Sequence, residues 1–239
     1  MINIRNSFKG GIPELDHIYE IYVGGRYSEL GNTTARLADF CTSLSSKIML
    51  EIDLHNYNLT EHEYKTKAIK DFELFYKQQD INRRQNPQYN QQYQSSAEAE
   101  AYFKRLQEYD LIELNEAKQL LRSYIQISSV HNAPSTTTFL GSSELDSRFT
   151  PKSLTTFGGL YKTVMYQLTP SIVTYFSTGN HLFIPIMNKG SYLGENPAFY
   201  HDERLVAAIC SHENYAILYL TDEEFKHFQT LNVPYALDY

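Results

Sequence analysis

The pattern of apolar and polar positions is clearest over residues 201–228, where it predicts helix, strand and helix in that order. The apolar residues of 201–210 recur at helical spacing, namely Leu205, Ala208 and Ile209. Residues 215–220 (YAILYL) form an almost unbroken apolar run, which predicts a strand that is buried on both faces. Thr221 and Glu224 fit a capping box, so we expect the second helix to begin there.

The N-terminal half is dominated by helix-period patterns, and we expect four antiparallel helices within residues 33–127. These helices span approximately residues 33–55, 60–79, 95–108 and 115–127. The apolar face of the first helix consists of Leu37, Phe40, Cys41, Leu44, Ile48 and Ile52. Capping boxes at Thr60–Glu63 and Ser95–Glu98 mark the starts of the second and third. A short helix over residues 13–21 is a further candidate.

The composition changes in the polar segments between these patterns. Residues 80–96 are rich in Asn and Gln and predict an exposed loop, and residues 131–158 are rich in Ser, Thr, Gly and Pro and predict a long connection. Residues 172–176 and 182–186 look like strands around a hairpin turn at 177–180, and residues 190–200 look like a loop.

These patterns together predict an α+β fold. We expect a helical N-terminal half of four to five helices, followed by a small mixed sheet with two to three helices. The expected organisation is a mainly helical region at 1–130, the connection at 131–158 and an α/β region at 159–239. Whether the two outer regions share one core stays open.

Charge and aromatic content bear on the kind of partner. The 239 residues include 28 acidic and 21 basic side chains, which gives a net charge of −7. An acidic chain disfavours general nucleic-acid binding, which needs basic surface, and it favours a basic protein partner through long-range attraction. The chain has 20 Tyr, 13 Phe and no Trp. Tyr is enriched at protein interfaces, although it also fills half-exposed cores.

The two cysteines, Cys41 and Cys210, are too few for a disulfide framework and fall on apolar sides of expected helices. The N-terminal residues lack the apolar core of a signal peptide, and the sequence has no apolar run of 18 residues. We therefore expect a cytoplasmic protein without membrane contact, and export that is independent of a cleaved signal stays open.

The densest group of ionisable side chains is His201-Asp202-Glu203, with His212 and Glu213 one expected helix length further on. A histidine beside carboxylates can perform acid–base chemistry, which makes His201 and Glu203 the candidate catalytic residues. The alternative is structural, because acidic residues favour any helix N-terminus and a histidine can cap it.

One partial motif resembles a known family. Zinc-dependent nucleobase deaminases carry H-x-E at a helix start and P-C-x-x-C after the next strand, and His201-Asp202-Glu203 is similar to the first part. After Pro234, however, Tyr235 and Asp238 stand where that family has cysteines. The resemblance therefore implies at most a metal-free relative, and the sequence predicts neither a metal nor a cofactor.

Two functions from different classes follow. The first is a protein-binding module, such as an inhibitor or immunity-type protein that sequesters a basic partner, because the chain is acidic, tyrosine-rich and without an intact catalytic motif. The second is an enzyme, such as a bacterial effector or toxin that acts as a hydrolase or is deaminase-like, with its site near residues 201–213. An Asn- and Tyr-rich chain without Trp is typical of bacterial and phage proteins.

Overall fold

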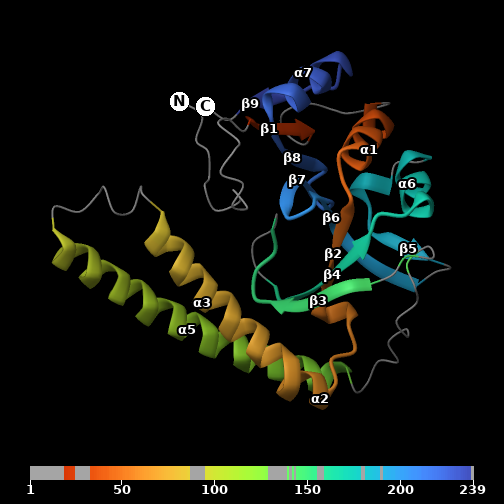
Figure 1. Ribbon diagram of the computed structural model, residues 1–239. Coiled ribbons are helices and arrows are strands. Elements are labelled where there is room, and N and C mark those ends of the chain that lie inside the picture. Colours follow the sequence, from red (N-terminus) through yellow and green to blue (C-terminus); the bar gives the residue numbers. More distant parts are fainter. Residues whose placement is uncertain are drawn as a thin grey trace.

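The structure is a computed structural model that describes residues 19–24, 33–86, 95–128, 139, 142, 144–154, 159–178, 181–188 and 191–237. Figure 1 shows a body built around a β-sheet and a long pair of helices that projects from one end of it. We call this helical pair, residues 61–85 and 96–128, the arm. Within the described ranges no helix is both long and apolar enough to cross a membrane.

The sheet is antiparallel and large. Its nine strands among the described residues run in the order β3-β4-β2-β6-β7-β8-β1-β9, and β5 pairs with β6 beside this path. The strands are β1 Tyr19–Gly24, β2 Lys47–Asp53, β3 Glu144–Thr150, β4 Tyr161–Gln167, β5 Ile186–Asn188, β6 Ser191–His201, β7 Arg204–Cys210, β8 Tyr215–Leu220 and β9 Ala236–Leu237. Because β2 pairs with both β4 and β6, the sheet joins segments from both halves of the chain.

The prediction of a small mixed sheet after a helical half was therefore wrong. The largest error concerns residues 201–210, which form a β-hairpin with the preceding segment instead of a helix. Residues 190–200, expected as a loop, mostly belong to β6, and the turn to β7 contains Asp202 with a φ of 52°. Every residue of β7 is buried, so the strand lacks the polar alternation that would have identified it.

The first expected helix was wrong in its second half. The helix α1, Thr34–Ser43, ends before Ser45, and β2 begins at Lys47. Ile48 and Ile52 are four residues apart, and this spacing puts two residues on one face of a helix and also on one face of a strand. The apolar period therefore continued through a change of secondary structure.

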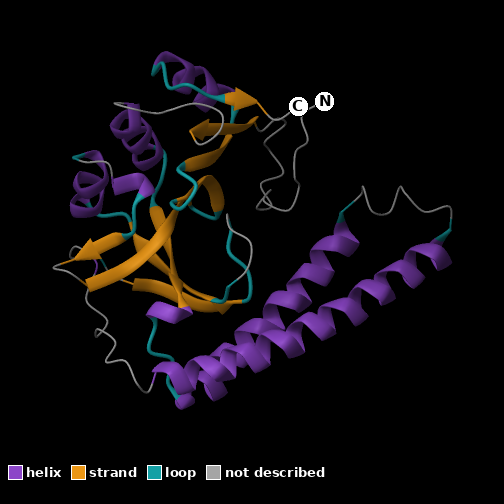
Figure 2. Cartoon of the chain, turned by 180° about the vertical axis from the view of Figure 1, so that it is seen from behind, coloured by secondary structure: helices purple, strands orange, loops and turns teal. Residues whose placement is uncertain are grey.

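One face of the sheet is covered by α1, α6 (Pro170–Ser177) and α7 (Asp222–Thr230), as Figure 2 shows from behind. Aromatic rings fill this core, with the Phe176 and Phe199 centroids 5.6 Å apart. The expected strand at 172–176 was wrong, because Pro170 stands at the first turn of α6, where proline is well tolerated. The strand over 215–220 and the capping box at Thr221 are both confirmed.

The arm is a helical hairpin. Its first helix runs without a break through α2 (Glu61–Glu63), the π-helical segment η5 (Tyr64–Ala68) and α3 (Ile69–Gln85), and its second is α5 (Ser96–Ser128). The capping box at Thr60 is confirmed, and the Glu98 N–H donates to Ser95 Oγ at 3.3 Å. The two sides meet through buried apolar residues, among them Phe72, Tyr76, Leu114, Leu121 and Tyr124.

The expected break after residue 109 was wrong, because α5 is a single helix of 33 residues. The acidic residue that suggested the break, Asp110, is buried and accepts a hydrogen bond from Arg83 Nη1 at 2.6 Å. Residues 80–85, expected in a loop, continue α3, whereas residues 87–94 of that loop lie outside the described residues. Residues 13–18 of the short N-terminal helix and 179–180 of the expected hairpin turn also lie outside them.

Two short 3-10 turns complete the described elements, η4 at Leu54–Asn56 and η7 at His181–Phe183. The first is important for the arm, because it connects β2 to the segment that enters α2. The connection predicted for residues 131–158 includes the strand β3, which forms one end of the sheet.

Candidate functional site

The two predicted catalytic residues lie at the turn between β6 and β7. His201 is the last residue of β6, and its Nδ1 lies 3.0 Å from the carbonyl oxygen of Leu44. Glu203 is 88% exposed and forms an ion pair with Lys47 at 2.9 Å, and this ammonium lowers the pKa of the Glu203 carboxyl. The two side chains are thus held by different partners, and their role in catalysis stays a prediction.

His212 and Glu213 lie in the turn at the opposite end of β7. Seven strand residues separate the two turns, a distance of about 23 Å along the strand. The structure therefore does not bring His212 to His201. It places His212 Nε2 instead at 3.0 Å from Glu195 Oε2, a carboxylate of β6 that is almost fully buried.

Glu195 belongs to a buried polar cluster centred on Glu51 of β2. Glu51 and Glu195 are register partners in the sheet, and the Glu51 side chain has no exposed surface. Glu51 Oε2 accepts a hydrogen bond from Ser153 Oγ at 2.5 Å, and Oε1 accepts one from the Leu154 N–H at 2.8 Å. Asn196 Nδ2 donates a third, at 2.9 Å.

Asn196 connects Glu51 to the turn that carries His212. Its backbone has a φ of 48°, a left-handed conformation that Asn adopts more readily than most residues. The Asn196 N–H donates to Ser211 Oγ at 3.1 Å, and the Ser211 N–H donates to Asn196 Oδ1 at 2.9 Å. This reciprocal pair fixes the position of the amide that faces Glu51.

Burial raises the pKa of Glu51, and the nearby charge of Glu195 raises it further, whereas the three hydrogen bonds oppose the shift. Desolvation dominates because the carboxylate has no contact with water. A raised pKa favours the protonated carboxyl, and such shifts occur in catalytic acids and also in structural groups. The contact between Glu195 and His212 permits proton exchange between these two groups.

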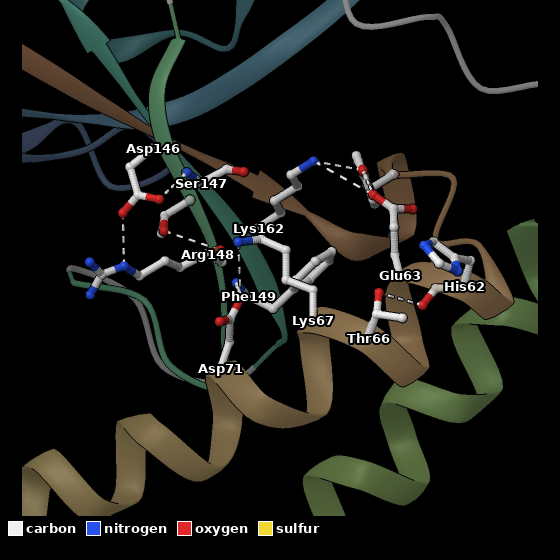
Figure 3. A network of polar contacts seen from close by, with 12 residues as sticks. His62, Glu63, Thr66, Lys67, Asp71, Asp146, Ser147, Arg148, Phe149 and Lys162 are labelled. Carbon is white, nitrogen blue, oxygen red and sulfur yellow. Dashed lines mark hydrogen bonds and ion pairs between the residues drawn. The ribbon is translucent and has the colours of Figure 1, made fainter.

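A second polar cluster joins the sheet to the base of the arm (Figure 3). Lys162 of β4 is buried, and its Nζ donates to Tyr57 Oη at 2.7 Å. Tyr57 Oη in turn donates to Glu63 Oε1 at 2.5 Å, and Lys162 Nζ lies 3.8 Å from the same oxygen. Burial lowers the pKa of Lys162, while Glu63 opposes the shift. The network fixes the start of the arm to the sheet.

The outer edge of β3 is closed by carboxylates. Asp71 Oδ2 on α3 accepts the Phe149 N–H at 3.0 Å, and Asp146 Oδ1 accepts the Ser147 N–H at 2.8 Å. Figure 3 shows both aspartates beside the strand. Occupied N–H groups cannot pair with an added strand, so this part of the edge is protected against β-pairing with another chain.

The clearest unoccupied apolar surface among the described residues is on the arm. The large apolar side chains exposed on α5 are Tyr109, Leu111, Ile112 and Leu120. Sequence reasoning missed this surface, because it placed a break between two helices at residues 109–114. A single uninterrupted helix period through residues 96–128 would have been the signal that identifies it.

Within the part of the chain that the structure describes, no group of three or more His, Cys, Asp or Glu side chains is arranged to hold a metal ion. Comparison of the chain with protein-family models, curated proteins and solved structures finds no match. The functional assignment therefore rests on the two polar clusters and on the arm.

Proposed function

We propose that this protein is a protein-binding module and that the outer face of α5 on the arm is its binding element. One observation carries the proposal. Three large apolar side chains lie on this face in the exposed state, with Tyr109 66% exposed, Ile112 57% and Leu120 46%. Exposed apolar groups that gather on one face of a helix mark an interaction surface more often than scattered ones do.

The arm is built as a stiff support for such a surface. Arg83 and Asp110 link α3 to α5 through a largely buried ion pair, and Lys118 Nζ pairs with Glu73 Oε1 at 2.7 Å. The polar cluster of Lys162, Tyr57 and Glu63 holds the base of the arm on the sheet. A preorganised element loses less conformational entropy on binding than a flexible one.

The negative charge of the chain resides in the body. Residues 61–85 and 96–128 of the arm hold 11 acidic and 10 basic side chains, so the other residues carry −6 of the total −7. This distribution favours a partner with a basic region that the body attracts while the arm supplies the apolar contact. Sequestration of a basic protein, as an inhibitor or immunity-type protein does, is the form of binding that we propose.

Two variants of the arm test the proposal in a quantitative capture experiment on lysate. Ile112→Glu puts a charge into the proposed face, and Leu111→Glu makes the same change on the adjacent residue, which is 58% exposed but lies about 100° further around the helix. We expect wild type and Leu111→Glu to retain the same partner and Ile112→Glu to lose it. Equal retention by all three would refute the proposal.

The Glu51 cluster favours an enzyme as a second candidate, because a buried carboxylate pair adjoins the half-exposed His212. In this alternative, His212 and Glu195 exchange protons with a substrate, and Glu51 holds Asn196 in place. Growth of cells that express the protein provides a first test. The site lies at this cluster if His212→Ala abolishes toxicity while His201→Ala and Glu203→Gln keep it. An absence of toxicity in every form, wild type included, would argue against an effector enzyme.

A further inference from the structure

The outer face of α5 carries a stripe of six exposed residues that are three or four positions apart, which places them on one side of the helix. The members of the stripe are Ala101, Arg105, Tyr109, Ile112, Glu116 and Leu120. They extend over about 29 Å of helix, which is sufficient for side-by-side pairing with another helix. Along the projecting part of the arm, Figures 1 and 2 draw α3 between α5 and the sheet.

The stripe is self-complementary when a second copy of the helix runs antiparallel to the first. The steps between its members are four, four, three, four and four, which read the same in both directions. A twofold axis between residues 110 and 111 would set each member of the stripe opposite another member on a second copy. Tyr109 would then face Ile112, and Arg105 would face Glu116. At the ends, the small Ala101 would face the larger Leu120. A twofold interface requires this kind of self-complementarity.

The stripe is not needed for the arm itself. The side of α5 that packs against α3 is a different one, on which Phe103, Leu114 and Leu121 are buried. Among the described residues, the ion pairs of the arm involve neither Arg105 nor Glu116. Both charges are thus available for an interaction outside the chain.

We propose that the occupant of this face is a second copy of the chain, whose α5 packs antiparallel to the first along the stripe, so that two arms form a four-helix assembly. This inference rests on the proposed function because it concerns the same face: a second copy covers the face in the isolated protein, and a basic partner would displace that copy. An unrelated helix would have to present an acid and a base at the same separation, whereas the chain itself supplies both. The arm's 11 acidic and 10 basic residues also let two arms approach without strong repulsion.

Charge reversal tests the pairing in the purified 239-residue chain, with mass measured by sedimentation equilibrium up to about 100 µM. We expect twice the mass of one chain for wild type. Two single variants, Arg105→Glu and Glu116→Arg, reverse one charge each. In a dimer of either variant, like charges face each other at both contacts between residues 105 and 116. Each should weaken dimerisation by about tenfold or more, while circular dichroism confirms the fold.

The double variant Arg105→Glu/Glu116→Arg restores both opposite-charge contacts and should dimerise like wild type. The two single variants, when mixed, should form a mixed dimer, because each then meets its complement. Lys104→Glu is the matched control: it makes the same charge change on an exposed residue outside the stripe. We expect it to dimerise nearly as well as wild type.

A wild-type chain that stays monomeric at the highest concentration would overturn the inference, and so would failure of the double variant and of the mixture to recover. The capture experiment separates this failure from that of the proposed function. A monomer that still captures a partner in an Ile112-dependent manner overturns only the second copy as occupant. Ile112→Glu is therefore included in the sedimentation experiment as well, and a variant that associates like wild type in both experiments overturns both proposals.

Discussion

Replacement of Glu51 measures what a fully buried carboxylate contributes to this fold. Glu51→Ala removes the acceptor of three hydrogen bonds. Ser153 Oγ can rotate to another acceptor, but the Leu154 N–H and Asn196 Nδ2 are left without one. Each buried donor that loses its partner costs about 1–3 kcal/mol, so we expect a loss of about 2–6 kcal/mol in the free energy of unfolding. Glu51→Gln keeps the shape and one oxygen, and it should cost less.

The pH dependence of the Gln variant carries the sharper prediction. Burial raises the pKa of Glu51 above its ordinary value of 4.5. Below that value the carboxyl is protonated in both the folded and the unfolded state, and its contribution to stability is fully present. As the pH rises through the folded-state pKa, this contribution is lost, at about 1.4 kcal/mol for each unit by which the folded pKa exceeds 4.5. Wild type should therefore lose stability relative to Glu51→Gln as the pH increases.

Urea unfolding followed by circular dichroism from about pH 4 to about pH 8 gives the required free energies. Glu213→Gln removes an exposed carboxylate from the neighbouring turn and corrects for the general effect of one charge. A difference between wild type and Glu51→Gln that stays constant with pH, or that moves in favour of wild type as the pH rises, would refute the reasoning. Hydrogen bonds to the ionised form would then balance or outweigh desolvation.

Two further predictions concern buried reactive groups. Cys41 and Cys210 have no exposed surface, and burial raises the pKa of the Cys41 thiol to about 12. Both thiols should therefore react with a thiol reagent only after unfolding. Rapid labelling of the native protein would contradict this prediction. Lys162→Met removes the donor to Tyr57 and the charge beside Glu63, and it should lower the free energy of unfolding by about 1–3 kcal/mol and speed hydrogen exchange at the base of the arm. Unchanged exchange there would show that the cluster does not hold the arm.

The sequence predicted those elements whose signals are local. The capping boxes at Thr60 and Thr221 depend on residues three positions apart, and both form as expected. The strand β8 is an apolar run bounded by polar turns, and it too was predicted correctly. Each signal is contained in fewer than ten residues, so the rest of the fold does not have to be known.

The errors arose where one pattern fits two structures. An apolar pair four residues apart, such as Ile48 and Ile52, is compatible with helix and strand alike. A strand buried on both faces, such as β7, has no alternation at all. The choice between the two structures depends on long-range pairing with β6 and β8, which no local pattern contains.

The Glu51 cluster escaped prediction for a related reason, yet the sequence holds one signal that points to it. Its members come from separate segments, and Glu51 itself lay within the helix expected over residues 33–55. In β2, however, Glu51 interrupts the apolar run KIMLEID. An acidic side chain inside a buried strand is costly unless donors surround it. Once β2 is recognised as a strand, Glu51 therefore requires partners from neighbouring segments, and Ser153 and Asn196 supply them.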